Sequence, residues 1–101
     1  MSDGGAETAR ELDMGFTVEE VAQGVERLLA ELALGARKLP VGGGWRFDAA
    51  PRVTIEIDRM PESRIRHPTL FPRTLLTLRG ETPVVEALYR KILLAFLRVG
   101  G

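Results

Sequence analysis

The residues with the most evident chemical potential lie in one stretch, "RMPESRIRHPTLFPRTLLTLRG", at positions 59–80. Arg64 and Arg66 are two positions apart, so in an extended chain they point to the same side, with the only histidine, His67, next to them. A guanidinium group donates two parallel hydrogen bonds to a phosphate or a carboxylate. This pattern favours an anion-binding surface for RNA, a nucleotide or an acidic protein, formed by Arg64, Arg66, His67 and Arg73.

A second interpretation is that these arginines pair with the chain's own acids. Residues 1–36 carry eight acidic side chains against two basic ones, whereas residues 37–101 carry twelve basic against six acidic. Such a chain can fold with its charges intermixed or bind head to tail to a partner. No glycine-rich phosphate loop accompanies the arginines, and aromatic residues that could stack on bases are few. Both interpretations stay open.

Other candidate sites carry less chemical information. Ser63 and His67 are the available nucleophile and base, but no Gly-x-Ser-x-Gly motif surrounds the serine. Glu56 and Asp58 share one side of a strand and could hold a hard cation, although a solvated strand face explains them better. One histidine and no cysteine cannot form a zinc site with nitrogen and sulfur ligands. We therefore expect no catalytic residue, no metal and no cofactor.

The clearest element that positions these residues is a helix over 17–34. Thr17 and Glu20 have the spacing of a capping box, apolar residues follow at helical intervals, and Gly35 stands where a glycine cap belongs. Gly24, inside the helix, indicates close packing against another element. A second helix begins near Thr82, with a proline in its first turn, and runs to the end of the chain.

Alternating apolar residues predict the strands. The first spans 8–14, although Arg10 falls on its apolar side; a hairpin covers 45–58, and a further strand covers 73–80. The stretch 36–44, "ARKLPVGGG", is interpreted as a connector. We expect an α+β fold of order β-α-β-β-β-α, a two-layer sandwich with a mostly antiparallel sheet of three or four strands and both helices on one face. One domain, 8–101, follows a flexible N-terminal segment, 1–7.

This order of elements is similar to that of two RNA-associated folds, the double-stranded-RNA-binding domain (αβββα) and the ribosome-hibernation factors (βαβββα). The similarity covers the order of elements alone. The last helix here begins "RGETPVVEAL", without the glycine-rich turn and lysine cluster of the first fold, and the basic helix surfaces of the second are also missing. Similarity of fold does not by itself carry function.

The second helix contains six consecutive apolar residues, "ILLAFL" at 92–97. Three or four apolar positions per two turns suffice to cover one helix face, so these six cover more than one. The run is far too short to cross a membrane. Either both sides of the helix are buried within the fold, or one side meets a partner. Because there is only one sheet to pack against, we favour a partner, most simply a second copy of the chain. The interface candidates are Leu93, Leu94 and Leu97, together with Leu75 on the strand 73–80.

Composition suggests a compartment and a source. The chain has no cysteine and no long apolar run, which favours the cytoplasm. It has no asparagine, one glutamine, and twelve arginines to two lysines, which favours a thermophilic source. The leading hypothesis is thus a small soluble non-enzymatic protein that acts by association as a homodimer. The alternative is an anion- or RNA-binding module that uses the arginine-rich loop at 59–73.

Overall fold

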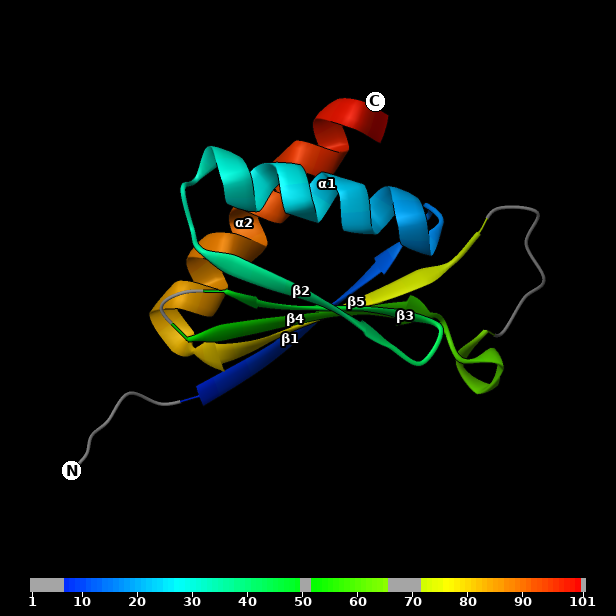
Figure 1. The fold of residues 1–101 in the computed structure, drawn as a ribbon. Helices are drawn as coiled ribbons and strands as arrows, with labels where there is room; N and C mark the ends of the chain where they lie inside the picture. Colours follow the sequence, from blue (N-terminus) through cyan, green and yellow to red (C-terminus); the bar gives the residue numbers. More distant parts are fainter. Residues whose placement is uncertain (1–6, 50–51, 66–71, 101) are drawn as a thin grey trace.

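The computed structural model describes residues 7–49, 52–65 and 72–100, in which two helices lie on one side of a five-stranded antiparallel sheet (Figure 1). The predicted α+β class is confirmed, but the predicted sheet of three or four strands is wrong, because the order is β-α-β-β-β-β-α. The strands are β1 (Glu7–Met14), β2 (Ala36–Val41), β3 (Gly44–Ala49), β4 (Val53–Arg59) and β5 (Thr74–Glu81), and the helices are α1 (Val18–Glu31) and α2 (Thr82–Gly100), with a 3₁₀ turn at Glu62–Arg64.

The strands lie in the order β1-β5-β4-β3-β2, so the first two strands of the chain form opposite edges of the sheet. Helix α1 carries the chain from one edge to the other, and β2 to β5 then return as a meander until β5 pairs with β1. In this register Leu12 and Ile57 both lie opposite Leu76. The N-terminal segment predicted to be flexible lies outside the described residues, except for Glu7, which begins β1.

The strand that the sequence did not predict is β2, which occupies most of the stretch interpreted as a connector. It pairs with β3 through a tight turn, where Val41 lies opposite Gly44 and Gly42 has a φ of +57°. Most of its residues are exposed, so no apolar alternation marks it. Proline is rare within strands, but Pro40 is tolerated here because β2 is an edge strand, which pairs with another strand on one side only.

Helix α1 begins as predicted and ends earlier. Thr17 and Glu20 form the capping box: the Thr17 hydroxyl accepts from the Glu20 amide at 3.1 Å, and the Glu20 carboxylate accepts from the Thr17 amide at 2.9 Å. The prediction that Gly35 caps the C-terminus is wrong. Ala33 takes the left-handed conformation instead, with a φ of 56°. The next residue, Leu34, donates its amide to the Leu29 carbonyl at 3.0 Å, which closes a Schellman motif.

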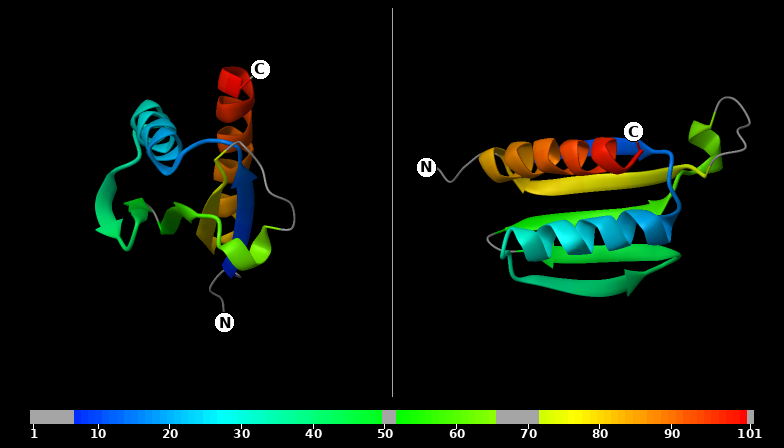
Figure 2. Two further views of the ribbon diagram at one scale, coloured as in Figure 1. Left: turned by 90° about the vertical axis from the view of Figure 1, so that its right-hand side faces the viewer. Right: turned by 90° about the horizontal axis from the view of Figure 1, so that it is seen from above.

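The core lies between the sheet and the helices. Figure 2 shows α1 above β3 and β4, and α2 above β5 and β1. Apolar side chains alternate along each central strand, so one face of the sheet is apolar and covered while the other is polar and open. The buried residues come from the sheet (Phe47, Ile55, Ile57, Leu76, Leu78), from α1 (Val21, Val25, Leu28, Leu29) and from α2 (Val85, Leu88, Ile92).

Candidate functional site

Helix α2 buries only one stripe of its apolar residues. Val85, Leu88 and Ile92 are 0%, 3% and 0% exposed, and their spacing of three and four residues places them on one side of the helix. This side faces β5 and β1. The other apolar residues of α2 therefore lie on other sides of the helix. Some of them contribute to two candidate surfaces, one near each end of the helix, which are described below.

The two helices cross where Phe96 meets Gly24. Helix α2 begins close to the sheet and rises past α1, so its last turns stand beyond α1 (Figures 1 and 2). The Phe96 ring packs against Phe16, with ring centroids 5.4 Å apart and the planes inclined at 59°. A Cβ atom on Gly24 would lie 2.5 Å from Phe96 Cζ. Gly24 thus marks close helix packing, as its position in the sequence predicted.

The first candidate surface is the apolar tip, which we define as Leu94 and Leu97. These side chains are 60% and 69% exposed, while Leu93 is partly buried. Among the residues that the structure describes, Val41 at the β2–β3 turn is the other large apolar side chain with comparable exposure. Phe96, which lies between the two leucines in sequence, packs against Phe16 and Gly24 and holds this part of the helix in place.

Leu75 does not belong to the same surface. It alternates along β5 with the buried Leu76, so its side chain lies on the open face of the sheet, opposite the helices. There it is partly buried, with Asp13 and Asp58 as its neighbours in the register. The structure therefore brings together three of the four predicted interface residues on α2 and places the fourth on the other side of the molecule.

The second candidate surface is an apolar groove between the C-terminal end of α1 and the N-terminal half of α2. The helices diverge from their crossing at Gly24, which leaves a hollow with a volume of ≈ 400 Å³. Leu88 is nearly buried and Ala87 is exposed and small. No local sequence pattern predicts this groove, because it depends on how the two helices cross. We call it the α1–α2 groove; it is lined by Leu32, Leu34, Pro83, Val84, Ala87, Leu88 and Lys91.

The predicted anion-binding residues are only partly described. Arg66 and His67 lie outside the described residues. Arg64 donates to Glu11 at 3.0 Å, and Arg73 donates through two nitrogens to the Asp13 carboxylate, a contact that raises the pKa of Arg73. Both described arginines therefore pair with acids of β1. An anion would have to displace these acids before it could bind there.

Further ion pairs intermix the acid-rich and base-rich parts of the chain. Lys38 donates to Glu26 of α1 at 3.1 Å and also lies over the Trp45 ring. On β1, Arg10 donates to both carboxylate oxygens of Glu86, at 2.9 and 2.8 Å, and lies over the Tyr89 ring. Helix α2 thereby accommodates the arginine that falls on the covered side of β1. The hydrogen bond with Arg10 lowers the pKa of Glu86.

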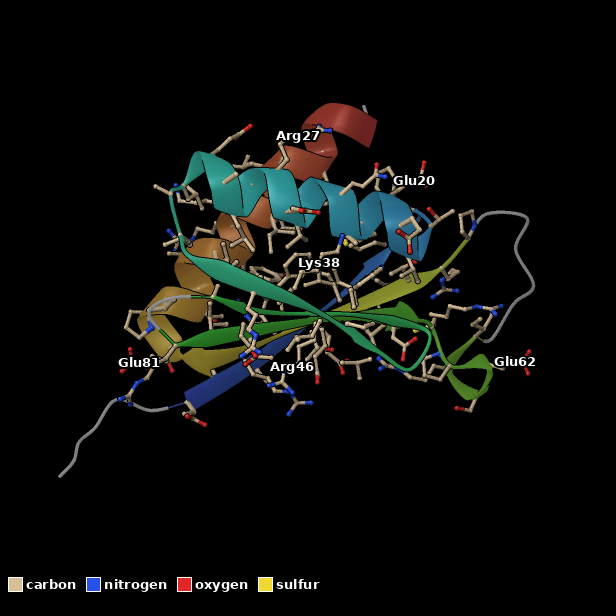
Figure 3. All side chains as sticks on the ribbon, viewed as in Figure 1. Glu20, Arg27, Lys38, Arg46, Glu62 and Glu81 are labelled. Atoms are coloured by element: carbon tan, nitrogen blue, oxygen red, sulfur yellow. The ribbon has the colours of Figure 1, made fainter. Side chains whose placement is uncertain are left out.

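The open face of the sheet carries charged side chains of both signs. In Figure 3, Arg46 points to this face while Lys38 points toward α1. Arg46 donates to both carboxylate oxygens of Asp48, at 2.9 and 3.2 Å, and this hydrogen bonding lowers the pKa of Asp48. The Nε atom of Arg79 lies 3.7 Å from Oε1 of Glu56. These pairs neutralise one another, so this face has no single sign of charge.

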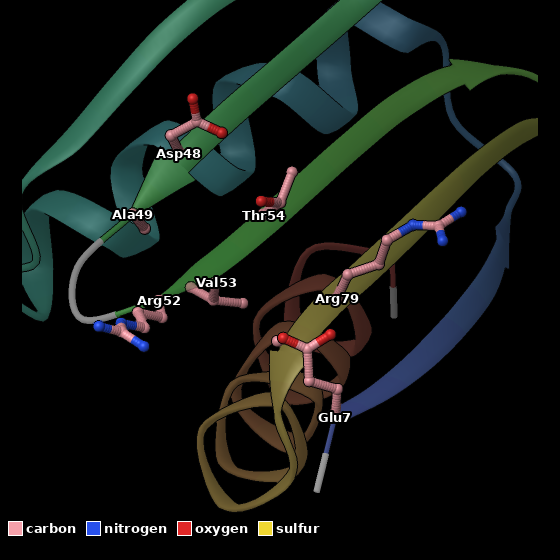
Figure 4. A pocket seen from close by; sticks show the side chains of 8 residues that line it. Glu7, Asp48, Ala49, Arg52, Val53, Thr54 and Arg79 are labelled. Carbon is pink, nitrogen blue, oxygen red and sulfur yellow. The ribbon is translucent and has the colours of Figure 1, made fainter. Parts of the chain in front are cut away.

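A shallow pocket lies at one end of the open face (Figure 4), with a volume of ≈ 420 Å³. Thr54 stands at its centre, and Arg52 and Arg79 lie on its rim. The two guanidinium groups point away from each other, so they do not converge on one ligand position. Within the described residues, no group of three or more histidine, cysteine or acidic side chains is placed to hold a metal ion. We therefore do not assign a ligand to this pocket.

Comparison of the chain with models of known protein families and with curated proteins found no match. Within the described part of the chain, neither helix has the length and apolar character needed to cross a membrane. The element order also differs from that of the ribosome-hibernation factors by the additional strand, β2. The function must therefore be inferred from the surfaces themselves.

Proposed function

We propose that this chain is a small cytoplasmic protein that acts by association with a second copy of itself, and not by catalysis. The observation that carries the proposal is the apolar tip of α2, where Leu94 is 60% exposed and Leu97 is 69% exposed. Exposed leucines that occur singly are normal on a protein surface, but these two are neighbours on one helix that projects past α1 (Figure 1).

The rigid support of the tip strengthens the proposal. Phe96 lies between the two leucines in sequence and packs on Phe16 and against Gly24. A surface that is held in place before binding loses less conformational entropy when a partner covers it. A second copy is the most economical partner, because a two-fold axis makes every contact twice and closes the assembly.

Light scattering of paired variants tests the proposal. Leu94→Glu combined with Leu97→Glu places charges in the proposed interface, so the measured mass should fall to that of the monomer. Val41→Glu is the matched control, because Val41 is also exposed, at 47%, but lies at the β2–β3 turn. The control should keep the wild-type mass. Loss of association in both variants, or in neither, would contradict the assignment of the interface to α2.

A further inference from the structure

The apolar tip is too small to form a stable interface alone. Stable protein interfaces bury about 800 Å² per partner. Two leucine side chains each offer less area than the roughly 150–250 Å² of an aromatic residue. A homodimer through Leu94 and Leu97 must therefore cover additional apolar surface. On this molecule, the α1–α2 groove provides such a surface on the same helix as the tip.

The groove and the tip lie on one face of α2. Ala87 and Leu94 are separated by seven residues, which is about two helical turns and about 10 Å along the axis. Both are exposed, and both point away from the buried stripe of Val85, Leu88 and Ile92. Ala87 opens the groove because its side chain is short, and its hollow of ≈ 400 Å³ falls in the range of about 300–1,000 Å³ that is typical of binding clefts.

We infer that the α1–α2 groove of each copy receives Leu94 and Leu97 of the other copy, an inference that rests on the proposed function. Two α2 helices related by a two-fold axis perpendicular to them run antiparallel, which places the C-terminal half of each over the N-terminal half of the other. With the axis near the middle of the pair, Leu94 of one copy lies opposite Ala87 of the second. The contact is reciprocal, so it closes at two copies.

Charged groups also lie near the groove, and the orientation rests on its apolar lining. Helix α1 ends at Glu31, has no basic residue in its last turn, and presents the negative end of its dipole there. On α2, Arg90 and Lys91 are exposed and lie one turn before Leu94. In the antiparallel arrangement these cations lie near the two-fold axis, beside the same residues of the second copy, because pairing Leu94 with Ala87 places residue 90 opposite residue 91. Lys91 also lines the groove itself, so the match between the groove and the leucine-bearing helix is one of apolar shape and not of charge.

Engineered cysteines test the arrangement directly, because the natural chain has none. A disulfide requires Cα atoms about 4.4–6.8 Å apart, so cysteines at 87 and 94 of one chain, about 10 Å apart, cannot pair with each other. A mixture of the variants Ala87→Cys and Leu94→Cys should therefore form a disulfide-linked heterodimer under mild oxidation, read on a non-reducing gel. A mixture of Val41→Cys and Leu94→Cys is the matched control and should not.

Each outcome has a defined meaning. Efficient cross-linking of Ala87→Cys with Leu94→Cys, without comparable cross-linking of either variant alone, supports the inference. Efficient cross-linking of Leu94→Cys alone shows that the tips meet each other, and it overturns the groove inference while the homodimer stands. A dimeric wild type without the mixed cross-link overturns the inference in the same way. A wild type that scatters light as a monomer overturns both the inference and the proposed function.

Discussion

Phe96 occupies the space that a side chain on Gly24 would need, since its Cζ lies 2.5 Å from the position of that missing Cβ. This contact sets the crossing of α1 and α2. It brings the helices together near the end of α2 and lets them diverge toward its beginning. The apolar tip and the α1–α2 groove are thus two consequences of one close approach.

The contact between these two residues can be measured with a double-mutant cycle. Gly24→Ala should stabilise α1 by about 1 kcal/mol through helix propensity. In the wild-type background the new methyl group collides with Phe96, and such overpacking costs about 1–3 kcal/mol. Gly24→Ala should therefore give no stabilisation in wild type and a gain in the Phe96→Ala background, as measured by urea unfolding. Equal gains in both backgrounds would show that the ring does not occupy this space.

The C-terminal cap of α1 predicts opposite effects of the same substitution at two nearby positions. Ala33 has a φ of 56°, a conformation that glycine adopts without strain, so Ala33→Gly should stabilise the fold by roughly 0.5 kcal/mol. Ala30 lies inside the helix and is exposed, so Ala30→Gly should destabilise it by about 1 kcal/mol. Urea unfolding at one protein concentration compares the two. Destabilisation by both would contradict the cap.

Acid should weaken the contact between β1 and α2. The hydrogen bond from Arg10 holds the pKa of Glu86 below its ordinary value of 4.5. A lowered pKa in the folded state contributes stability above pH 4.5, and this contribution is lost as the pH falls through the folded value. Melting temperatures of wild type should therefore fall faster with acidification than those of Glu86→Gln. Parallel curves would show that this pair contributes nothing to the acid response.

The anion-binding alternative makes a different prediction about salt. If Arg64 and Arg73 bind RNA, affinity should fall steeply with salt, and replacing both with alanine should reduce the slope of log affinity against log salt by about 1.4–1.8. Dimerisation through apolar side chains should instead be maintained or strengthened by sulfate salts. Filter binding and light scattering across a salt series separate the two. Specific RNA binding with the steep slope would favour the alternative.

The sequence predicts those elements whose signals are local. Thr17 and Glu20 identify the start of α1 because a capping box lies within four residues, and the alternation of Val53, Ile55 and Ile57 identifies β4 because one of its faces is buried. Strand β2 was not predicted because an exposed edge strand needs no alternation of apolar and polar residues. The end of α1 was misplaced because a left-handed alanine took the position expected of glycine.

The candidate surfaces were predictable to different degrees. The number of apolar residues in α2 indicated that some of them would not be covered by the sheet. In the structure, Leu94 and Leu97 are exposed. The α1–α2 groove depends on the crossing of two helices far apart in the sequence. The acids that pair with Arg64 and Arg73 could not be predicted either. They lie on β1, which is far from β5 in the sequence and becomes its neighbour only when the sheet forms. Long-range contacts of this kind leave no local pattern.

Sedimentation equilibrium of the wild-type chain, from micromolar to near-millimolar concentration, tests the central claim most directly. The account predicts a mass that rises with concentration from 11.1 kDa to twice that value and then stops, because a two-fold contact closes. A mass that stays at 11.1 kDa throughout, or that keeps rising beyond the dimer, would contradict it.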